Sequence, residues 1–453
     1  MYYIFRSSIP LSMLIFCLFY CTKSNNNSAG SGGTGTTPVS DTLPDQFARI
    51  SDSVLLDKIE SQTLKYFTDF AHPTSVMARE RNTSGDVVTT GGTGFGIMAI
   101  IVGANRGFIS KTEAFNQIYK ITNFLLNSAS RYHGAFAHWI NGATGATVPF
   151  SSADNGADIV ETSYLMEGLL TARQYFNGSS SDEISLRNNI NTLWNGVDWT
   201  WFQKGGLSML YWNWSPDQGW AVNVAVQGWN EALITYILAA SSNSYAIDKS
   251  VYSIGWAQNG AMKNGNIYYN TVLPLGPTLG GPLFFSHYSF LGLNPKGLSD
   301  TYANYWQQDT AHAHINYAYC VANPNNYKGY SIDCWGLTAS DNKDGDDAQS
   351  PINDNGTISP TAAVSSLPYV PNASMRAIKY FYYKLGNKIW GDYGFVDAFN
   401  QTQSWYATSY LAIDQGPQIV MIENYRSGLV WNLFMSCPEI QNGLQKLGFT
   451  ATK

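Results

Sequence analysis

The sequence predicts an all-α fold in which pairs of helices form a double-layered ring, an α/α toroid. About a dozen segments space their apolar residues as a helix does, and few segments read as strands. Long stretches rich in Gly, Asn, Pro and Trp separate the helices, and such connections often carry binding and catalytic residues. About six helix pairs would close the ring, with the more apolar helices inside.

The first expected helix illustrates the pattern, because Leu55, Ile59 and Phe67 recur at near-helical spacing. The same reasoning predicts helices over residues 51–71, 95–106, 111–128, 157–176, 182–202, 229–241, 247–259, 300–322, 372–385, 404–413, 417–427 and 429–447. Residues 94–104 and 231–240 are rich in apolar and small residues and suit the inner layer of the ring. Residues 111–128 and 372–385 are amphipathic and suit the outer layer.

The first residues read as a secretion signal rather than as part of the fold. Arg6 supplies the positive start, and the apolar run from residue 9 to residue 20 is too short to span a bilayer stably. The run ends in Leu-Phe-Tyr-Cys, which resembles a bacterial lipobox with Cys21 as the lipidated residue. An ordinary cleaved signal peptide is the alternative. We expect residues 1–21 to be a lipoprotein signal peptide.

The polar residues 22–45 are expected to form a flexible linker. No later stretch reads as a domain linker, and the polar residues 340–358 are expected to form a loop. One domain is therefore expected over residues 46–453. A lipid at Cys21 would be the only membrane contact of a periplasmic or outer-membrane lipoprotein, which we expect to be a monomer.

The composition excludes several classes of protein. Charged residues are 13% of the chain and aromatic residues 14%, which argues against disorder. The net charge of −6 argues against nucleic-acid binding, which needs a basic surface. The many Trp and Tyr side chains suit a cleft in which flat rings stack on sugars, although filling a large core is an equally good account of any one ring.

Signals for a metal site are weak. His312 and His314 are two apart on an expected helix, so their side chains point in different directions. Cys320, Cys334 and Cys437 show no CxxC spacing, and we expect no metal or redox centre. A disulfide between Cys320 and Cys334 and a pair of buried thiols both remain open.

Cleavage of a glycosidic bond needs one carboxylic acid and one carboxylate, and three clusters of acids lie in apolar or aromatic surroundings. In the first cluster, Asp158 and Glu161 are three apart at the start of an expected helix and share one face, with Asp154 just before them. Helix capping by Asp154 or Asp158 is the alternative to a catalytic role, and the two remain equally good.

The second cluster centres on Glu231, which opens an apolar helix and lies near Trp214 and Trp220 in the sequence. Burial among indoles would raise the pKa of this carboxyl, as a general acid requires. The helix N-terminus acts in the opposite direction. A simple first-turn acid is the alternative.

The third cluster contains Asp414 and Pro417, followed by Glu423 and Arg426. Proline favours the first position of a helix, which would place Asp414 in a tight junction between two helices. Glu423 and Arg426 are three apart and are expected to pair. A structural salt bridge is the favoured interpretation of that pair, and substrate contact is the alternative.

Taken together, these clusters resemble the bacterial glycoamylase-like family, and within it the endo-β-1,2-glucanases of Bacteroidota-type bacteria. The first stretch that carries the resemblance reads Asp-Asn-Gly-Ala-Asp-Ile-Val-Glu-Thr-Ser-Tyr. The stretches are residues 154–164, 212–216, 228–231, 273–276, 281–292, 335–341, 356–363 and 412–417. The Asp-rich residues 341–350 depart from the family pattern, which puts the preference for particular sugar subsites in doubt.

The resemblance implies an (α/α)6 barrel without a cofactor. It implies cleavage of β-1,2-glucan to sophoro-oligosaccharides, with inversion. Glu231 is then the expected general acid and Asp414 the expected general base, with Asp158 as the rival base and Glu161 orienting the substrate or the neighbouring acid. An inverting pair should stand about 6.5–9.5 Å apart to leave room for water.

Side chains near the acids are the expected sugar contacts: Trp139, Trp212, Trp214, Trp229, Tyr288, Glu423 and Arg426. Three other functions remain open. An exo-acting glucosidase or glucoamylase-like enzyme would need a blocked pocket, and a non-catalytic glycan-binding lipoprotein would need no buried acids. A polysaccharide lyase would need a basic cleft, which the low Lys and Arg content disfavours.

Overall fold

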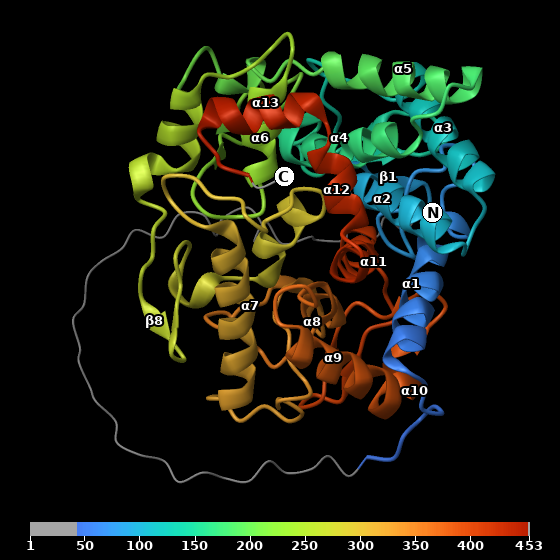
Figure 1. Ribbon diagram of the computed structural model, residues 1–453, viewed down its shortest axis with the longest axis vertical. Helices are drawn as coiled ribbons and strands as arrows, with labels where there is room; N and C mark the ends of the chain where they lie inside the picture. The colour runs from blue at the N-terminus through green and yellow to red at the C-terminus, as the bar shows by residue number, and fades with distance from the viewer. Residues whose placement is uncertain (1–42, 452–453) are drawn as a thin grey trace, which may run out of the picture. The chain divides into compact units, whose positions relative to one another are not determined.

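The structure of the protein is a computed structural model that describes residues 43–451. The expected signal peptide, Cys21 and the linker up to residue 42 lie outside the described residues. Residues from Gln46 onward form one unit, which contains the helices and strands of the described chain. Helices supply most of its regular structure, as predicted, and its strands are short (Figure 1).

The helices and their bounds are α1 Asp52–Thr68, α2 Thr90–Arg106, α3 Lys111–Asn127, α4 Ile159–Tyr175, α5 Ser181–Asn195, α6 Leu233–Ser241, α7 Tyr305–Ala322, α8 Pro360–Ser365, α9 Pro371–Lys379, α10 Gly386–Ile389, α11 Ala412–Arg426, α12 Leu429–Met435 and α13 Pro438–Leu447. Short helical turns connect some of them, including η2 Trp201–Gln203, η3 Val251–Trp256, η6 Leu283–Ser286 and η7 Tyr288–Phe290.

The strands pair in antiparallel ribbons, and only β1, β2 and β3 make a three-stranded sheet among the described residues. Their bounds are β1 Val87–Thr89, β2 Trp139–Asn141, β3 Thr147–Val148, β4 Ala157–Asp158, β5 Leu210–Tyr211, β6 Asn213–Trp214, β7 Ala225–Val226, β8 Ile267–Tyr268, β9 Thr271–Val272, β10 Ala339–Asn342, β11 Gly345–Ala348, β12 Trp390–Gly391, β13 Gly394–Phe395, β14 Phe399–Asn400 and β15 Trp405–Tyr406.

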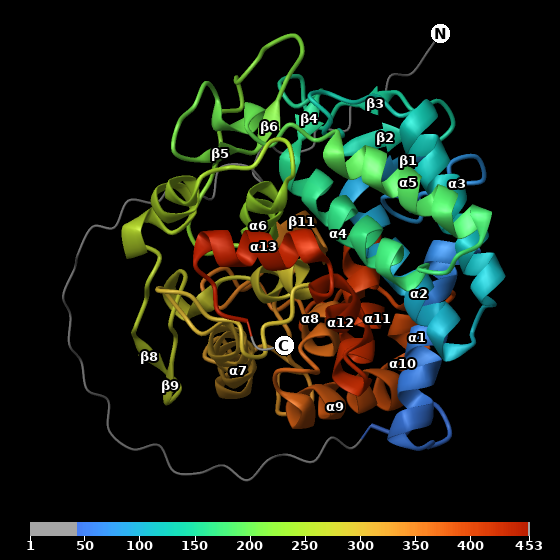
Figure 2. The same ribbon diagram turned by 45° about the horizontal axis from the view of Figure 1, so that its top comes forward.

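Helix α2 packs between α4 and α11 with its backbone in close contact with both (Figure 2). Every residue from Thr90 to Gly103 is buried, as expected for the apolar segment 94–104. A Cβ atom on Gly94 would lie 2.1 Å from the carbonyl oxygen of Tyr164 on α4. A Cβ on Gly92 would lie 2.7 Å from the Cβ of Ala412 on α11. The small residues of α2 therefore permit a close approach on two sides.

These contacts also fix the direction of the three helices. Gly92 near the start of α2 meets Ala412 at the start of α11, and Arg106 at the end of α2 pairs with Glu423 near the end of α11. Gly94 likewise meets the first half of α4. The three helices run parallel, so their N-termini lie together.

Several other helices bury only one face. Helix α3 buries Ala114, Ile118, Ile121 and Leu125 at helical spacing and exposes its opposite side, as the amphipathic pattern predicted. Helix α6, in contrast, is buried along its whole length.

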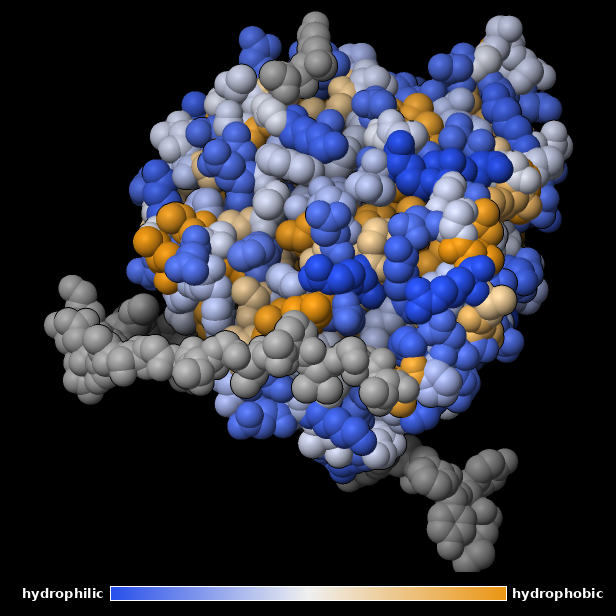
Figure 3. All heavy atoms as spheres, turned by 60° about the horizontal axis from the view of Figure 1, so that its bottom comes forward, coloured by the Kyte–Doolittle hydropathy of each residue, from blue (hydrophilic) through white to orange (hydrophobic). Residues whose placement is uncertain are grey.

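On the face drawn in Figure 3, hydrophilic residues cover most of the surface and apolar ones form scattered patches, which is ordinary for a globular protein.

Some predicted boundaries were wrong. Residues 404–413 are not a helix, because the strand β15 and extended chain precede α11. The helix expected over 182–202 ends at Asn195, and the one over 247–259 shrinks to the turn η3. Residues 429–447 split into α12 and α13, and the second of these starts at Pro438, which cannot continue a helix from the N-terminal side.

Two further expectations need correction. Pro417 lies inside α11 rather than at its first position, so Asp414 belongs to the first turn of that helix and not to a junction between two helices. Part of the expected loop 340–358 is the β10–β11 hairpin. Among residues 43–451, Cys320, Cys334 and Cys437 are buried thiols that form no disulfide, which answers the question of a Cys320–Cys334 bridge. No helix within residues 43–451 is long and apolar enough to cross a membrane.

Candidate active site

The meeting of the helix starts brings acids from distant parts of the chain together. Glu161, in the first turn of α4, accepts a hydrogen bond of 2.7 Å from the backbone N–H of Gly91 at the start of α2. A Cβ atom at Gly91 would lie 2.5 Å from the Oε2 atom of Glu161, so only glycine fits without displacing the carboxylate. The glycine-rich start of α2 thus serves the site by holding Glu161.

Asp158 caps α4, as one of the two interpretations of the sequence predicted. Its Oδ1 atom accepts hydrogen bonds from the N–H groups of Val160 and Glu161 at 3.0 and 2.9 Å. Its Oδ2 atom lies 3.1 Å from Nδ1 of His138. The residue is 1% exposed. Both carboxylate oxygens of Asp158 are therefore engaged.

His138 is a charged partner that the sequence analysis missed. Burial lowers its pKa, but Glu161, Asp158 and Asp154 outweigh that effect and raise the pKa to about 9. The ring also packs against Phe150 and Trp139. We infer an imidazolium that offsets part of the negative charge of three acids.

The remaining acids of this group have raised pKa values. Burial, followed by the charge of Asp158, raises the pKa of Asp154 to about 7. Burial is also the largest cause of the raised pKa of Glu161, which His138 partly counteracts. A group of this kind binds protons in the neutral pH range, where acid–base catalysis operates.

Glu231 lies two residues before α6, rather than on the helix as expected. Its backbone carbonyl accepts hydrogen bonds from the hydroxyl groups of Tyr164, at 3.4 Å, and Ser289. Burial raises the pKa of its carboxyl to about 7, and the charges of Glu161 and Asp158 add to the effect. The raised pKa that the sequence predicted is therefore present, and Glu231 lies within electrostatic reach of the first cluster.

Asp414 is buried in the first turn of α11. Its backbone carbonyl accepts a hydrogen bond of 2.8 Å from the hydroxyl group of Thr361 on α8. Burial raises the pKa of its carboxyl well above the usual value, and the neighbouring carboxyl of Asp397, to which it is hydrogen-bonded, raises it further.

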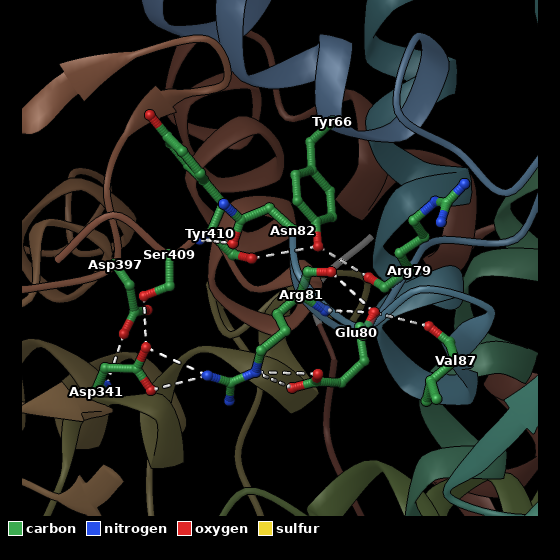
Figure 4. A network of polar contacts seen from close by, with 11 residues as sticks. Tyr66, Arg79, Glu80, Arg81, Asn82, Val87, Asp341, Asp397, Ser409 and Tyr410 are labelled. Carbon is green, nitrogen blue, oxygen red and sulfur yellow. Dashed lines mark hydrogen bonds and ion pairs between the residues drawn. The ribbon is translucent and has the colours of Figure 1, made fainter. Parts of the chain in front are cut away.

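A polar network extends from Asp397 through Asp341 to Arg81 and Glu80 (Figure 4). Asp397 accepts a hydrogen bond of 2.7 Å from the backbone N–H of Asp341 on β10. The Asp341 carboxylate pairs with Arg81 at 3.2 Å, and Arg81 pairs with Glu80 at 3.1 Å. The sequence analysis did not single out Asp397, Arg81 or Glu80, since each lies in a short loop without a recognisable pattern.

Tyr288 connects the two groups of acids. Its ring packs against Phe95, Tyr164 and Phe284. Burial raises the pKa of its hydroxyl well above the usual value, followed by the charges of Asp414 and Glu231. The structure thus brings Tyr288 into the site, where the sequence predicted a sugar contact.

The four predicted tryptophans fall into two classes. Trp139, Trp212 and Trp214 are half-buried, and Trp214 lies on β6 beside β4, which leads into Asp158. Trp229 is 5% exposed and packs against Phe290 and other core rings. The first three remain available for sugar stacking, whereas Trp229 belongs to the core.

Glu423 and Arg426 are not brought to the acids. They lie at the opposite end of α11 from Asp414, about 13 Å or more along the helix axis. They also do not pair with each other, because each has a partner on another helix. Glu423 pairs with Arg106 at 2.6 Å, and Arg426 pairs with two acids of α1, Asp57 and Glu60, at 2.7 Å. A structural role, the favoured interpretation of the sequence, fits these contacts.

The two histidines that were weighed as metal ligands face different neighbours. His312 contacts Ser286, and His314 contacts Thr271. Within residues 43–451, no group of three or more His, Cys, Asp or Glu side chains is arranged to hold a metal ion.

Comparisons with known proteins assign this chain to a family. A family model described as "Putative glucoamylase" matches residues 223–438. The chain is 48% identical to an endo-β-1,2-glucanase from Chitinophaga pinensis, over 89% of this chain and 99% of that one, with a TM-score of 0.87. It is 53% identical to a structure from Bacteroides uniformis that carries the same description as the family model, over 89% and 99% of the two chains, with a TM-score of 0.88.

A curated relative from Parabacteroides distasonis is named exo β-1,2-glucooligosaccharide sophorohydrolase (non-reducing end). It is 46% identical over 421 residues, which cover 88% of this chain and 58% of that protein. The chain thus spans little more than half the length of this relative. Identity of about half over nearly the whole length of the two solved structures shows that the chain belongs to the glycoamylase family.

Proposed function

We propose that the chain is a glycoside hydrolase that cleaves β-1,2-glucan. The observation that carries the proposal is the position of Glu231, whose half-buried side chain lies within electrostatic reach of the acids at the start of α4 and whose pKa is raised to about 7 by desolvation. A carboxylic acid that keeps its proton near neutral pH can protonate a leaving oxygen. The substrate class rests on the relatives from Chitinophaga and Parabacteroides, both named for β-1,2-linked glucans or their oligosaccharides.

Glu231 is the proposed general acid and Asp414 the proposed general base that activates water, with inversion at the anomeric carbon. Asp158 is the weaker candidate for the base, because the N–H groups of α4 and the ring of His138 already engage both of its oxygens. Glu161 would orient the substrate or the neighbouring acid. Trp139, Trp212, Trp214 and Tyr288 would contact the sugar.

The finer features of the fold and location are part of the same proposal. The parallel starts of α2, α4 and α11, with α6 and α8 beside them, would belong to the inner layer of an (α/α)6 barrel. A lipid at Cys21 would anchor a monomeric enzyme to a bacterial membrane, as a periplasmic or outer-membrane lipoprotein.

We propose an endo-acting mode, supported by the similarity to the Chitinophaga enzyme over 99% of its chain. Release of sophorose from the non-reducing end is the second candidate, because the Parabacteroides relative is named for it. The two modes differ in their first products. An endo-enzyme releases oligosaccharides of many lengths early, whereas an exo-enzyme releases one short product throughout.

The test is product analysis with purified protein from residue 46 onward. The protein is incubated with linear β-1,2-glucan and, in parallel, with starch and laminarin. The comparison uses Glu231→Gln and, as a matched control, Glu113→Gln in the first turn of α3, where the side chain is exposed. We expect oligosaccharides from β-1,2-glucan alone, full activity in the control and at least about a 100-fold loss in Glu231→Gln.

Each alternative gives a different result. Sophorose as the sole early product would replace the endo mode with the exo mode. Cleavage of starch would overturn the substrate class, and a fully active Glu231→Gln variant would overturn the role of Glu231. Binding of the glucan without any cleavage would favour a glycan-capture protein.

A further inference from the structure

Asp397, between β13 and β14, has an unusual set of contacts. Its side chain is almost fully buried, with 3% of the residue exposed. Its Oδ2 atom accepts the backbone N–H of Asp341, but among the described residues its Oδ1 atom receives no hydrogen bond from any group that carries a fixed hydrogen. The carboxyl is hydrogen-bonded to the carboxyl of Asp414. A buried acceptor is thus paired with a second acceptor.

Two ionised carboxylates cannot make a hydrogen bond, because neither carries a hydrogen. Two negative charges in contact within the protein also repel each other strongly, so that one of the two keeps a proton. Burial is the largest cause of the raised pKa of both groups: that of Asp397 reaches about 7, and that of Asp414 rises well above its usual value. The contact between the two carboxyls and the charge balance therefore both favour one shared proton.

We propose that Asp397 is a positioning residue for Asp414, and that the two carboxyl groups hold a single proton between them. This inference rests on the proposed function only for the role of Asp414 as the base. The charges that face the pair come from other elements. Asp341 on β10 adds negative charge, and Arg81, in the loop before β1, counteracts it.

The groups beyond them complete the surroundings of the pair. Glu80 pairs with Arg81 on the side away from Asp341, and Tyr288 on η7 carries a neutral hydroxyl near Asp414. Ser409 donates a hydrogen bond to the Asp341 carboxylate. With one proton on the pair, Asp397, Asp414, Asp341 and Glu80 carry three negative charges against the one positive charge of Arg81. A second ionisation of the pair would add a fourth negative charge without a new cation.

In the hydrolytic step, the oxygen of water bonds to the anomeric carbon while the glycosidic C–O bond breaks. The leaving oxygen keeps the electron pair of that bond and takes the proton of Glu231. The proton released by water enters the Asp397–Asp414 pair, which then carries two protons. The enzyme returns to its starting state when the pair releases one proton to solvent and Glu231 takes one up. Asp397 lets Asp414 accept a proton without ever being a lone buried charge.

The test measures the proton directly, without substrate. The carbonyl stretch of protonated carboxyl groups is followed by infrared difference spectroscopy as the pH is raised, for the wild type, Asp397→Asn and Asp414→Asn. Other buried acids, such as Asp309, are present in all three proteins. Their signals therefore cancel when the pH-dependent spectra of each variant are compared with those of the wild type. In either variant the remaining carboxyl faces a neutral amide that can donate a hydrogen bond. We therefore expect it to lose its proton at least about one pH unit below the last proton of the wild-type pair.

A kinetic measurement separates positioning from a merely structural role. Asn at position 397 keeps an oxygen for the N–H of Asp341, so a structural role predicts unchanged kinetics. We expect kcat of Asp397→Asn to fall about tenfold or more, with KM within about twofold, because Asp397 is buried and acts through Asp414. Asp346→Asn is the matched control. Asp346 is an exposed acid on the β10–β11 hairpin, which also carries Asp341. It lies near Arg81 but does not contact the Asp397–Asp414 pair.

The outcomes are distinct. Loss of the last carboxyl proton at the same pH in the wild type and both variants overturns the shared proton, and wild-type kcat in Asp397→Asn overturns the positioning role. Should Asp397→Asn fail to fold, Asp414→Asn still tests the shared proton. An inactive wild type would sink the proposed function, but the infrared result would still decide the state of the pair.

Discussion

At the scale of single residues, side chains of the site combine structural and electrostatic roles. Asp158 caps α4 and also binds His138, so the choice that the sequence left open, capping or function, is not exclusive. His138 itself carries no signal in the sequence, where it follows Ala-Phe-Ala without a motif. Its importance comes from the acids that the fold places around it.

Replacement of His138 by Gln is expected to change stability in a pH-dependent way. The pKa of His138 rises from 6.5 to about 9 on folding, so its contribution to stability is fully present below about pH 6.5 and is lost as the pH rises through about 9. The contribution corresponds to at most about 3 kcal/mol. Urea unfolding of the wild type and His138→Gln at several pH values should show a difference that shrinks on the alkaline side.

A matched change is His314→Gln, at a histidine that contacts Thr271 rather than an acid. We expect this control to show no such trend. A stability difference for His138→Gln that stays constant from acid to alkaline pH would mean that the imidazole contributes packing alone, without charge.

At the scale of elements, the site depends on how closely the helix starts approach one another. The glycines of α2 permit this approach, since each contact with α4 or α11 leaves no room for a Cβ atom. The sequence showed these glycines as an apolar, small-residue helix, which correctly predicted burial. It could not show which neighbours they touch, because that is set by the packing of helices far apart in the chain.

Gly94→Ala is expected to destabilise the protein by about 1–3 kcal/mol. The new methyl group would lie 2.1 Å from the carbonyl oxygen of Tyr164, a backbone atom that cannot move without shifting α4. In an open helix, the same change would stabilise by about 0.4–1 kcal/mol, so the sign of the effect reports the contact. Thermal or urea unfolding measures it.

The same helix offers a control in Gly103→Ala. There the new methyl group would meet the end of the Leu64 side chain, at 2.4 Å, and that side chain can change its rotamer. We expect a smaller loss of stability than for Gly94→Ala. Equal losses in the two variants would show that the α2–α4 contact yields as easily as a side chain.

The elements also show where prediction from sequence ends. Helical spacing located α1, α3 and α4 to within about three residues at each end, because each buries a regular stripe or a continuous apolar run. It failed over 404–413, where apolar residues line a short ribbon whose strands are too brief to show alternation. Asp397 lies in the same region of ribbons, so neither its burial nor its contact with Asp414 could be read from its neighbours.

At the scale of the whole molecule, the acids of the site titrate as a coupled system. They come from stretches far apart in the chain, near residues 80, 160, 231, 341 and 400–414, and the pKa of each depends on charges of the others. Three acid clusters could be recognised in the sequence because burial of a charge needs a reason. Their coupling, and the cation Arg81 between Glu80 and Asp341, depend on the complete fold.

This coupling predicts the alkaline side of the pH profile. Glu231 must hold its proton to act as a general acid, and burial together with Glu161 and Asp158 sets its pKa at about 7. The value of kcat/KM, which reports the free enzyme, should therefore fall as the pH rises through about 7. A nitrophenyl glycoside of sophorose should identify the group responsible for this alkaline fall, because its leaving group needs little protonation by a general acid. Glu231→Gln should retain most of its activity on this substrate and lose the alkaline fall, whereas a fall that persists in Glu231→Gln would assign the titration to another acid of the site.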